Sequence, residues 1–213
     1  MGRVPLVWTD SRSVIHLLRH GQSESNAKGL LVGRSDPPLT DRGRAQAKRL
    51  REILAGAEEV WSSPLSRARE TARLAVPDLE ARVEESFIEV DYGSLDGLPL
   101  DRVSEDEWRA FETDHSVSFG GGESLALVDE RVQRVLDALL VDEESLLHSP
   151  DRHLVIVSHL SPVKSAVAWA LGVPGSVAWR TRIDNASVTT LGVRRGSPHL
   201  VAMNVVPAPL TTN

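Results

Sequence analysis

Three polar clusters, each directly after a short apolar run, carry the side chains in this sequence that could do chemistry. They are Arg19-His20, the segment 63–67 that ends in Arg67, and Ser158-His159. An arginine guanidinium group presents planar pairs of N–H donors that match the oxygens of a phosphoryl group. A neutral imidazole can attack phosphorus, and a second imidazole can donate to the oxygens of the group in transfer. Two arginines and two histidines therefore indicate phosphoryl transfer through a covalent phosphohistidine.

The leaving oxygen of such a reaction must take up a proton. A carboxyl group that surrounding negative charge keeps partly protonated can supply it, and can afterwards act as the base for water. This chemistry needs two histidines and one carboxyl group, so we expect no metal ion and no other cofactor.

The composition excludes several other classes of protein. The 213 residues include no cysteine, which rules out disulfide scaffolds, cysteine-based zinc sites and thiolate nucleophiles. Lys and Arg number 24 against 30 Asp and Glu, a net charge of −6 without a long basic run, so we expect no nucleic-acid partner. No apolar run reaches the roughly 18 residues that span a bilayer, and residues 1–13 lack a secretory signal pattern. We therefore expect a cytoplasmic protein without a membrane partner.

The length suits one domain, which we place at residues 14–206, with an N-terminal extension at 1–13 and a tail at 207–213. Apolar β-branched runs predict buried strands, and amphipathic stretches between them predict helices. We expect strands at 14–18, 60–63, 153–157, 187–193 and 199–206, and helices at 40–54, 64–75, 124–140 and from 161 onward, with Ser161 as the N-cap and Pro162 as the first helical residue.

Strands that alternate with helices indicate an α/β domain with a doubly wound, mostly parallel sheet flanked by helices. In such sheets, ligands bind beyond the carboxyl ends of the strands. The three polar clusters all follow the carboxyl ends of predicted strands. We therefore expect them to meet at one edge of the sheet.

A series of motifs in the same order along the chain resembles the histidine phosphatase superfamily, the phosphoglycerate-mutase-like proteins. Residues 19–26, RHGQSESN, are similar to the family's R-H-G-[EQ]-[ST]-x-x-N, and Val157-Ser158-His159 to its strand-terminal V-[ST]-H. Further matches are residues 33–43 to G-x-x-D-x-P-L-T-x-x-G, 62–72 to S-x-L-x-R-A-x-x-T-A, 89–93 to E-x-x-x-G, and 121–124 to G-G-E-S. The resemblance covers about residues 14–205 and implies the same mostly parallel α/β fold.

The resemblance also implies roles for individual residues. His20 would be the phosphorylated nucleophile, and Glu89 the proton donor, although Asp91 and Glu123 are nearby acids of the same chemistry. Arg19, Arg67 and His159 would bind the phosphoryl group, with help from Ser23, Asn26 and the backbone of Gly33. His159 has the alternative interpretation of a buried or helix-capping imidazole.

Two segments depart from the family pattern and bear on the substrate. Leu160 follows the second histidine where glycine is common, and residues 94–97, SLDG, replace a frequent x-W-E-G. The true mutases carry E-R-H-Y-G and a longer central region, whereas residues 89–93 here read EVDYG and residues 101–114 are compact and acidic. These differences favour a phosphatase over a mutase.

The sequence thus predicts a metal-independent phosphomonoesterase that acts on a small phosphorylated substrate. Two alternatives stay open: a phosphoglycerate-mutase-type isomerase, and a module that binds phosphorylated ligands without turning them over. The segment 87–123 is expected to select the substrate, which the sequence does not name, and a homodimer is possible.

Overall fold

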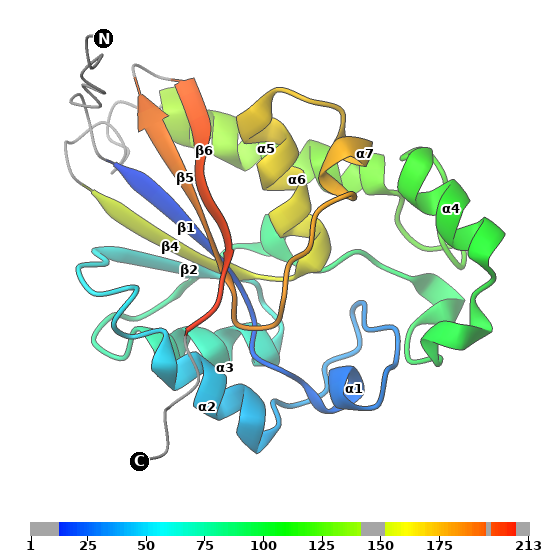
Figure 1. Cartoon of the computed structure of the whole chain (residues 1–213), viewed down its shortest axis with the longest axis horizontal. Coiled ribbons are helices and arrows are strands. Elements are labelled where there is room, and N and C mark those ends of the chain that lie inside the picture. The colour runs from blue at the N-terminus through cyan, green and yellow to red at the C-terminus, as the bar shows by residue number, and fades with distance from the viewer. Residues whose placement is uncertain (1–12, 142–151, 195–196, 208–213) are drawn as a thin grey trace, which may run out of the picture.

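A six-stranded sheet forms the centre of the computed structural model, which describes residues 13–141, 152–194 and 197–207 (Figure 1). Its strand order is β3-β2-β4-β1-β5-β6. The first four of these run parallel, whereas β5 is antiparallel to β1 and β6 is antiparallel to β5. The predicted mostly parallel sheet is confirmed. The strands are β1 (Val14–Arg19), β2 (Glu59–Ser62), β3 (Arg82–Val83), β4 (His153–Ser158), β5 (Val188–Arg194) and β6 (Ser197–Val205).

Helices cover both faces of the sheet, and the side chains of each strand point alternately toward one helical layer and the other. Leu154 and Ile156 of β4 pack into the core that includes α5 and α6, whereas Val155 and Val157 pack with residues of α3. Successive side chains of a strand point to opposite faces, so a strand covered on both sides reads as one continuous apolar run. The helices of these layers are α2 (Asp41–Arg49), α3 (Ser66–Ala75), α5 (Leu125–Val141) and α6 (Leu160–Leu171).

The carboxyl ends of β1, β2 and β4 lie next to one another. Arg19 of β1 is in register with Ser158 of β4, and Ser62 of β2 is in register with Val157. The pairing continues past the strands, because the His20 amide donates to the Ser158 carbonyl at 3.0 Å. The three polar clusters therefore meet at one edge, as predicted.

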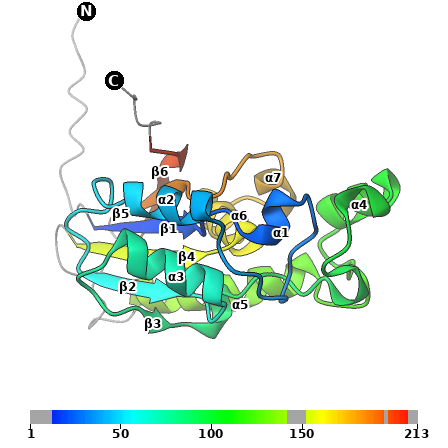
Figure 2. The ribbon, with the colours of Figure 1, turned by 90° about the horizontal axis from the view of Figure 1, so that it is seen from below.

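A cap, which we define as residues 93–122, lies between β3 and α5 in the chain. Its helix α4 (Glu105–Thr113) stands at one end of the molecule, away from the strands, in both views (Figures 1 and 2). Phe111 of α4 stacks on Phe119 with ring centroids 4.6 Å apart, and meets the Trp179 ring at 5.8 Å. Trp179 follows the short helix α7 (Gly175–Ala178), so aromatic contacts join the cap to the rest of the domain.

Several helix boundaries differ from the predictions. α2 ends at Arg49 rather than at residue 54, because the chain turns over residues 50–56 on its way to β2. α6 begins at Leu160 with His159 as its N-cap, so the expected N-cap role of Ser161 is wrong. Glu89, distant in sequence, accepts from the first two amides of this helix, which makes a local side-chain cap unnecessary.

α3 likewise begins later than predicted, at Ser66 rather than residue 64. Its N-cap, Leu65, has no side-chain acceptor, and the Ser66 amide instead donates to the Asp36 carboxylate at 2.8 Å. A short helix α1 (Glu24–Ala27) was not predicted. The first amides of both α3 and α6, which follow β2 and β4, thus donate to carboxylates from elsewhere in the chain.

The proposed division of the chain stays a prediction at its ends, because residues 1–12 and 208–213 lie outside the described residues. Within the parts that the structure describes, no helix is both long enough and apolar enough to cross a membrane.

Candidate active site

His20 lies directly after β1 and is almost closed to solvent, with 3% of its surface exposed. Its Nδ1 lies 2.7 Å from the backbone oxygen of Gly21, which can only accept, so the ring proton sits on Nδ1. Nε2 then carries a lone pair, and accepts a 3.3 Å hydrogen bond from Nε of Arg67. His20 therefore presents an unprotonated nitrogen, the form that a nucleophile requires.

Arg67 projects from the first turn of α3, and its side chain is fully buried. Beyond its bond to His20, Nη1 donates to the Ser35 carbonyl and Nη2 to the Gly33 carbonyl, both at 2.7 Å. The Asp36 carboxylate lies 3.5 Å from Nη1 and provides a counter-charge. These contacts fix the plane of the guanidinium group beside the His20 ring.

Asp96, at the start of the cap, holds the loop that in turn holds Arg67. One carboxylate oxygen accepts from the Gly33 amide at 2.9 Å and the Ser35 hydroxyl at 2.7 Å, and the other accepts from the Ser35 amide at 2.7 Å. Burial alone would raise the pKa of Asp96, but these hydrogen bonds keep it below its ordinary value. Sequence reasoning gave Asp96 no role, although its place in the departing segment 94–97 was a usable signal.

His159 follows β4, and its ring is fully buried 5.0 Å from that of His20, centroid to centroid. Its Nε2 lies 2.7 Å from the Ser63 hydroxyl oxygen, which accepts from the Leu65 amide. We assign the Ser63 hydroxyl hydrogen to Nε2, which leaves the proton of the neutral imidazole on Nδ1. This Nδ1 is buried without a partner among the described residues, and the ring makes no capping hydrogen bond. His159 therefore has a spare donor beside His20.

Arg19 provides a second spare donor. Its Nη1 donates to the Ile183 carbonyl at 2.7 Å, whereas its buried Nε has no partner in the part of the chain that the structure describes. A buried donor without an acceptor costs about 1–3 kcal/mol. Arg19 and His159 therefore each have a buried N–H donor that an added acceptor would satisfy.

Glu89 is nearly buried at the start of α6, with both carboxylate oxygens occupied by backbone amides. Oε1 accepts from Val90 at 3.0 Å and from Ser161 at 3.1 Å, while Oε2 accepts from Leu160 at 3.0 Å. The carboxylate also meets the positive end of the α6 dipole. Negative charge was expected around this carboxyl group, but in the free protein it is surrounded by backbone N–H donors.

The two alternative acids lie in different environments. Glu123 forms an ion pair with Arg131 at 2.8 Å, and Asp91 is half-buried and accepts from the Gly93 amide at 2.8 Å. Of the three candidate acids, Glu89 is the one that accepts hydrogen bonds from the first amides of α6, the helix that begins directly after His159. The position of Glu89 fits the proposed proton donor best.

Burial and positive charge keep both histidines neutral. Burial, followed by the charges of Arg67 and Arg19, holds the pKa of His20 well below its ordinary value of 6.5. Burial and the charge of Arg67, together with His20 and Arg19, do the same to the pKa of His159. Near neutral pH the site thus combines uncharged imidazoles with two guanidinium cations, an arrangement that favours an incoming anion.

The remaining predicted binding residues lie close to His20 but bind one another. The Asn26 side-chain oxygen accepts from the Ser23 hydroxyl at 3.0 Å and from Asn185 Nδ2 at 3.2 Å, and Asn185 also donates to the His20 carbonyl. Ser23 caps α1. The Gly33 amide donates to Asp96, as described, and its carbonyl faces Arg67. Their roles in holding a phosphoryl group remain predictions.

Two glycines, Gly21 and Gly43, allow the start of α2 to pack against the loop that follows β1. A Cβ atom on Gly43 would lie 2.1 Å from the Gln22 carbonyl oxygen, and one on Gly21 would lie 2.4 Å from the Gly43 oxygen. Only residues without a side chain fit this contact. The backbone that carries His20 is therefore packed directly on the backbone of α2.

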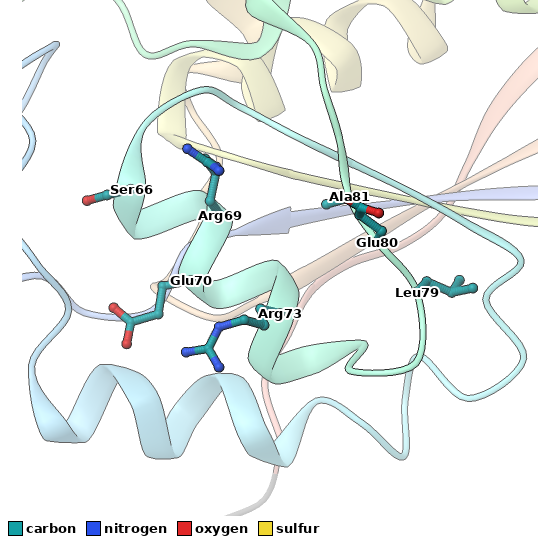
Figure 3. Close-up of a pocket in the computed structure, with 7 residues that line it drawn as sticks. All are labelled: Ser66, Arg69, Glu70, Arg73, Leu79, Glu80 and Ala81. Atoms are coloured by element: carbon teal, nitrogen blue, oxygen red, sulfur yellow. The ribbon is translucent and has the colours of Figure 1, made fainter.

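A separate surface pocket of about 380 Å³ lies beside α3 and is lined by none of the predicted site residues. Figure 3 shows the residues that line it, which come from α3 and from the segment 79–81. Among the described residues, no group of three or more histidine or acidic side chains is placed to hold a metal ion.

Comparison with known proteins agrees with this arrangement. A family model described as the histidine phosphatase superfamily, branch 1, matches residues 15–206. Phosphoserine phosphatase 1 from Hydrogenobacter thermophilus is 34% identical over 197 residues, which cover 89% of this chain and 90% of that protein.

Two further relatives come from mycobacteria. A bifunctional protein of Mycobacterium tuberculosis is 33% identical over 193 residues, 85% of this chain but 51% of that protein, so this chain spans about half its length. The solved structure of mycobacterial glucosyl-3-phosphoglycerate phosphatase with VO3 has a TM-score of 0.82 and is 28% identical, covering 92% of this chain and 100% of that chain.

Proposed function

The chain belongs to branch 1 of the histidine phosphatase superfamily, and on that premise we propose that it hydrolyses phosphomonoesters through a phosphohistidine on His20. One observation carries the proposal. The unprotonated Nε2 of His20 lies among two buried donors that lack acceptors, on Arg19 and His159. A phosphoryl group would supply those acceptors and place phosphorus beside the nucleophile.

In the proposed first step, His20 Nε2 attacks phosphorus and the bond from phosphorus to the ester oxygen breaks. Arg19, Arg67 and His159 donate to the phosphoryl oxygens, which carry the charge of the transition state. Arg67 exchanges its bond to His20 for one to the phosphoryl group. Glu89 gives a proton to the leaving alcohol oxygen.

In the second step, Glu89 takes a proton from water, whose oxygen attacks the phosphohistidine. The bond from phosphorus to Nε2 breaks, and inorganic phosphate leaves with His20 restored. The bound phosphoryl group brings negative charge to the site, which favours proton uptake by a neighbouring carboxylate. The hydrogen bonds from α6 fix the orientation of the Glu89 carboxylate.

The names of the relatives support a hydrolase. Both phosphoserine phosphatase 1 and the glucosyl-3-phosphoglycerate phosphatase are phosphatases by name, and we extend to this chain the general activity on small phosphorylated compounds. The proposed reaction uses only side chains of the chain itself.

Release of phosphate from an aryl phosphate in EDTA tests the proposal directly. We expect the wild type to release phosphate and the His20→Ala variant to lose at least about a thousandfold in kcat/KM. His153→Ala, which removes an imidazole at the opposite end of β4, is the matched control and should keep its activity. Brief incubation with a radiolabelled phosphoester should label the protein through an acid-labile bond that His20→Ala does not form.

Three results would overturn the proposal. Full activity in His20→Ala would exclude this nucleophile. Binding of phosphorylated ligands by the wild type, without phosphate release, would favour the binding module, while phosphate transfer that depends on a bisphosphate primer would favour the mutase.

A further inference from the structure

Lys164 is a buried cation that the proposed reaction does not use. It lies in the second turn of α6, and 5% of its surface is exposed. The rest of this helix, Leu160–Leu171, carries no other charged residue. Lysine is almost never buried unless it is paired with an acid. Its surroundings therefore need an explanation.

The Lys164 ammonium group has fewer partners than it can bind. Nζ donates one hydrogen bond, of 3.2 Å, to the Trp179 carbonyl, and lies 4.1 Å from the centroid of the Trp179 ring. An ammonium group has three N–H donors. Within the described residues, no carboxylate forms an ion pair with it. An acceptor for the remaining donors is missing.

Lys164 lies on the helix whose first amides donate to Glu89, and its neighbour Trp179 meets Phe111 of the cap. The charges of Arg19 and Glu89, on the catalytic side, and of Glu112, on α4, all act on it. It follows His159 by five positions of the same helix, about 7.5 Å along the axis at 1.5 Å per residue. The Lys164 backbone is thus about one and a half turns of α6 beyond His159.

We propose that Lys164 is a specificity residue that binds a carboxylate of the substrate, so that this enzyme prefers small phosphomonoesters with a carboxylate near the phosphoester. The inference rests on the proposed function, because it places the phosphoryl group at His20. A carboxylate carries one negative charge and accepts through two oxygens, which matches the one charge and the spare donors of Lys164.

The aromatic surroundings make this contact selective. The ring of Trp179 shields the ammonium group on one side, and Phe111 of the cap packs against Trp179. An ion pair away from water is worth more than one in bulk solvent. Burial lowers the pKa of Lys164 to about 8, so most of the protein carries the ammonium form at pH 7. A neutral group at the same place in a ligand would leave the cation unpaired.

The test compares 3-phosphoglycerate with glycerol 3-phosphate, which has a hydroxymethyl group in place of the carboxylate. Calorimetry on the His20→Ala protein at pH 7 gives both dissociation constants without turnover. We expect 3-phosphoglycerate to bind at least about tenfold more tightly, and Lys164→Met to reduce this preference to within about twofold. Lys48→Met, which removes an exposed lysine of α2, is the matched control and should leave the preference unchanged.

The test compares the ratio of the two dissociation constants within each protein, so any general effect of a variant on the phosphoryl site cancels. Lys164→Arg should keep part of the preference, which separates loss of charge from loss of packing. Equal binding of the two ligands by the parent protein, or binding of neither, would overturn the inference whether or not the variants fold. A preference that survives Lys164→Met in a folded protein would do the same.

This binding test and the phosphate-release test of the proposed function can fail separately. A protein that releases phosphate from an aryl phosphate but shows no preference loses this inference alone. A protein that shows a preference dependent on Lys164 without phosphate release keeps the carboxylate site and loses the hydrolase.

Discussion

Asp96→Ala should impair phosphoryl binding although the residue is not expected to touch the substrate. The change removes the three hydrogen bonds that hold Gly33 and Ser35. The carbonyls of these two residues accept from both Nη atoms of Arg67, whose Nε contacts His20. Loss of Asp96 should therefore free the loop and let the guanidinium group turn away from the nucleophile.

The magnitude follows from these contacts. Hydrogen bonds to a charged acceptor contribute about 1.5–3 kcal/mol each when buried. Asp96 is half-buried, so water replaces much of this, and we expect a loss of about 2–3 kcal/mol in the free energy of unfolding. For a domain of this size, that corresponds to a drop of roughly 5–10 °C in Tm. Displacement of Arg67 should lower kcat/KM about 10- to 100-fold.

Steady-state phosphate release and thermal unfolding measure both effects. Asp96→Asn should be intermediate, because the amide keeps one acceptor oxygen but not the second. Asp78→Ala removes an exposed acid beyond α3 and should change neither quantity, which controls for the loss of charge. A folded Asp96→Ala protein with kcat/KM within twofold of the wild type would refute the argument that this carboxylate positions Arg67.

Three further predictions concern the histidines and the glycine contact. Ser63→Ala should lower kcat/KM about tenfold in a folded protein, because His159 loses its 2.7 Å contact; unchanged kinetics would show that this hydroxyl does not orient the ring. Since the pKa of both His20 and His159 lies well below 6.5, their ring NMR signals should stay those of neutral imidazole as the pH falls to about 5.5. In the unfolded chain the same imidazoles take up protons below pH 6.5, so the free energy of unfolding should fall as the pH falls below 6.5. A titration centred near 6.5 would contradict this. Gly43→Ala should destabilise the protein by about 2–3 kcal/mol in urea unfolding, because the new Cβ would lie 2.1 Å from the Gln22 oxygen; an increase in stability, as for an open helical glycine, would show that the contact relaxes freely.

The sheet and its catalytic edge could be predicted because their signals are local. The run at 153–157 is buried on both faces, and its polar end places His159 beside His20 through strand pairing. The apolar run and the polar cluster after it each consist of residues adjacent in sequence, and the general preference of ligands for the carboxyl ends of parallel strands brings the clusters together.

The starts of α3 and α6 could not be predicted by the same rules. Ser161 and Pro162 form a good local start signal, yet α6 begins at Leu160 because Glu89 accepts its first amides across the fold. The same tertiary capping by Asp36 sets the start of α3. A rule that considers only neighbours in the sequence cannot include these partners.

The contacts that surround the site residues could not be predicted from the sequence either. Arg67 was expected to bind phosphate, but its dependence on Asp96 passes through a loop that is far from both in sequence. Lys164 had one usable signal, as the single charge in an otherwise uncharged helix. The identity of its neighbour, Trp179, emerges only when α7 is placed against α6.

The two ends of the cap contact different parts of the protein, and this limits which segments of it could be exchanged by engineering. Its first residues include Asp96, which holds the loop bonded to Arg67, the arginine proposed to bind phosphate, whereas α4 stands apart from the strands (Figure 1). A graft that exchanges the whole cap would disturb the chemistry together with the choice of substrate. If the segment 87–123 selects the substrate as predicted, a graft confined to α4 and its flanking turns would alter the choice of substrate and leave the reaction intact, and the boundary between the two properties would fall inside the cap.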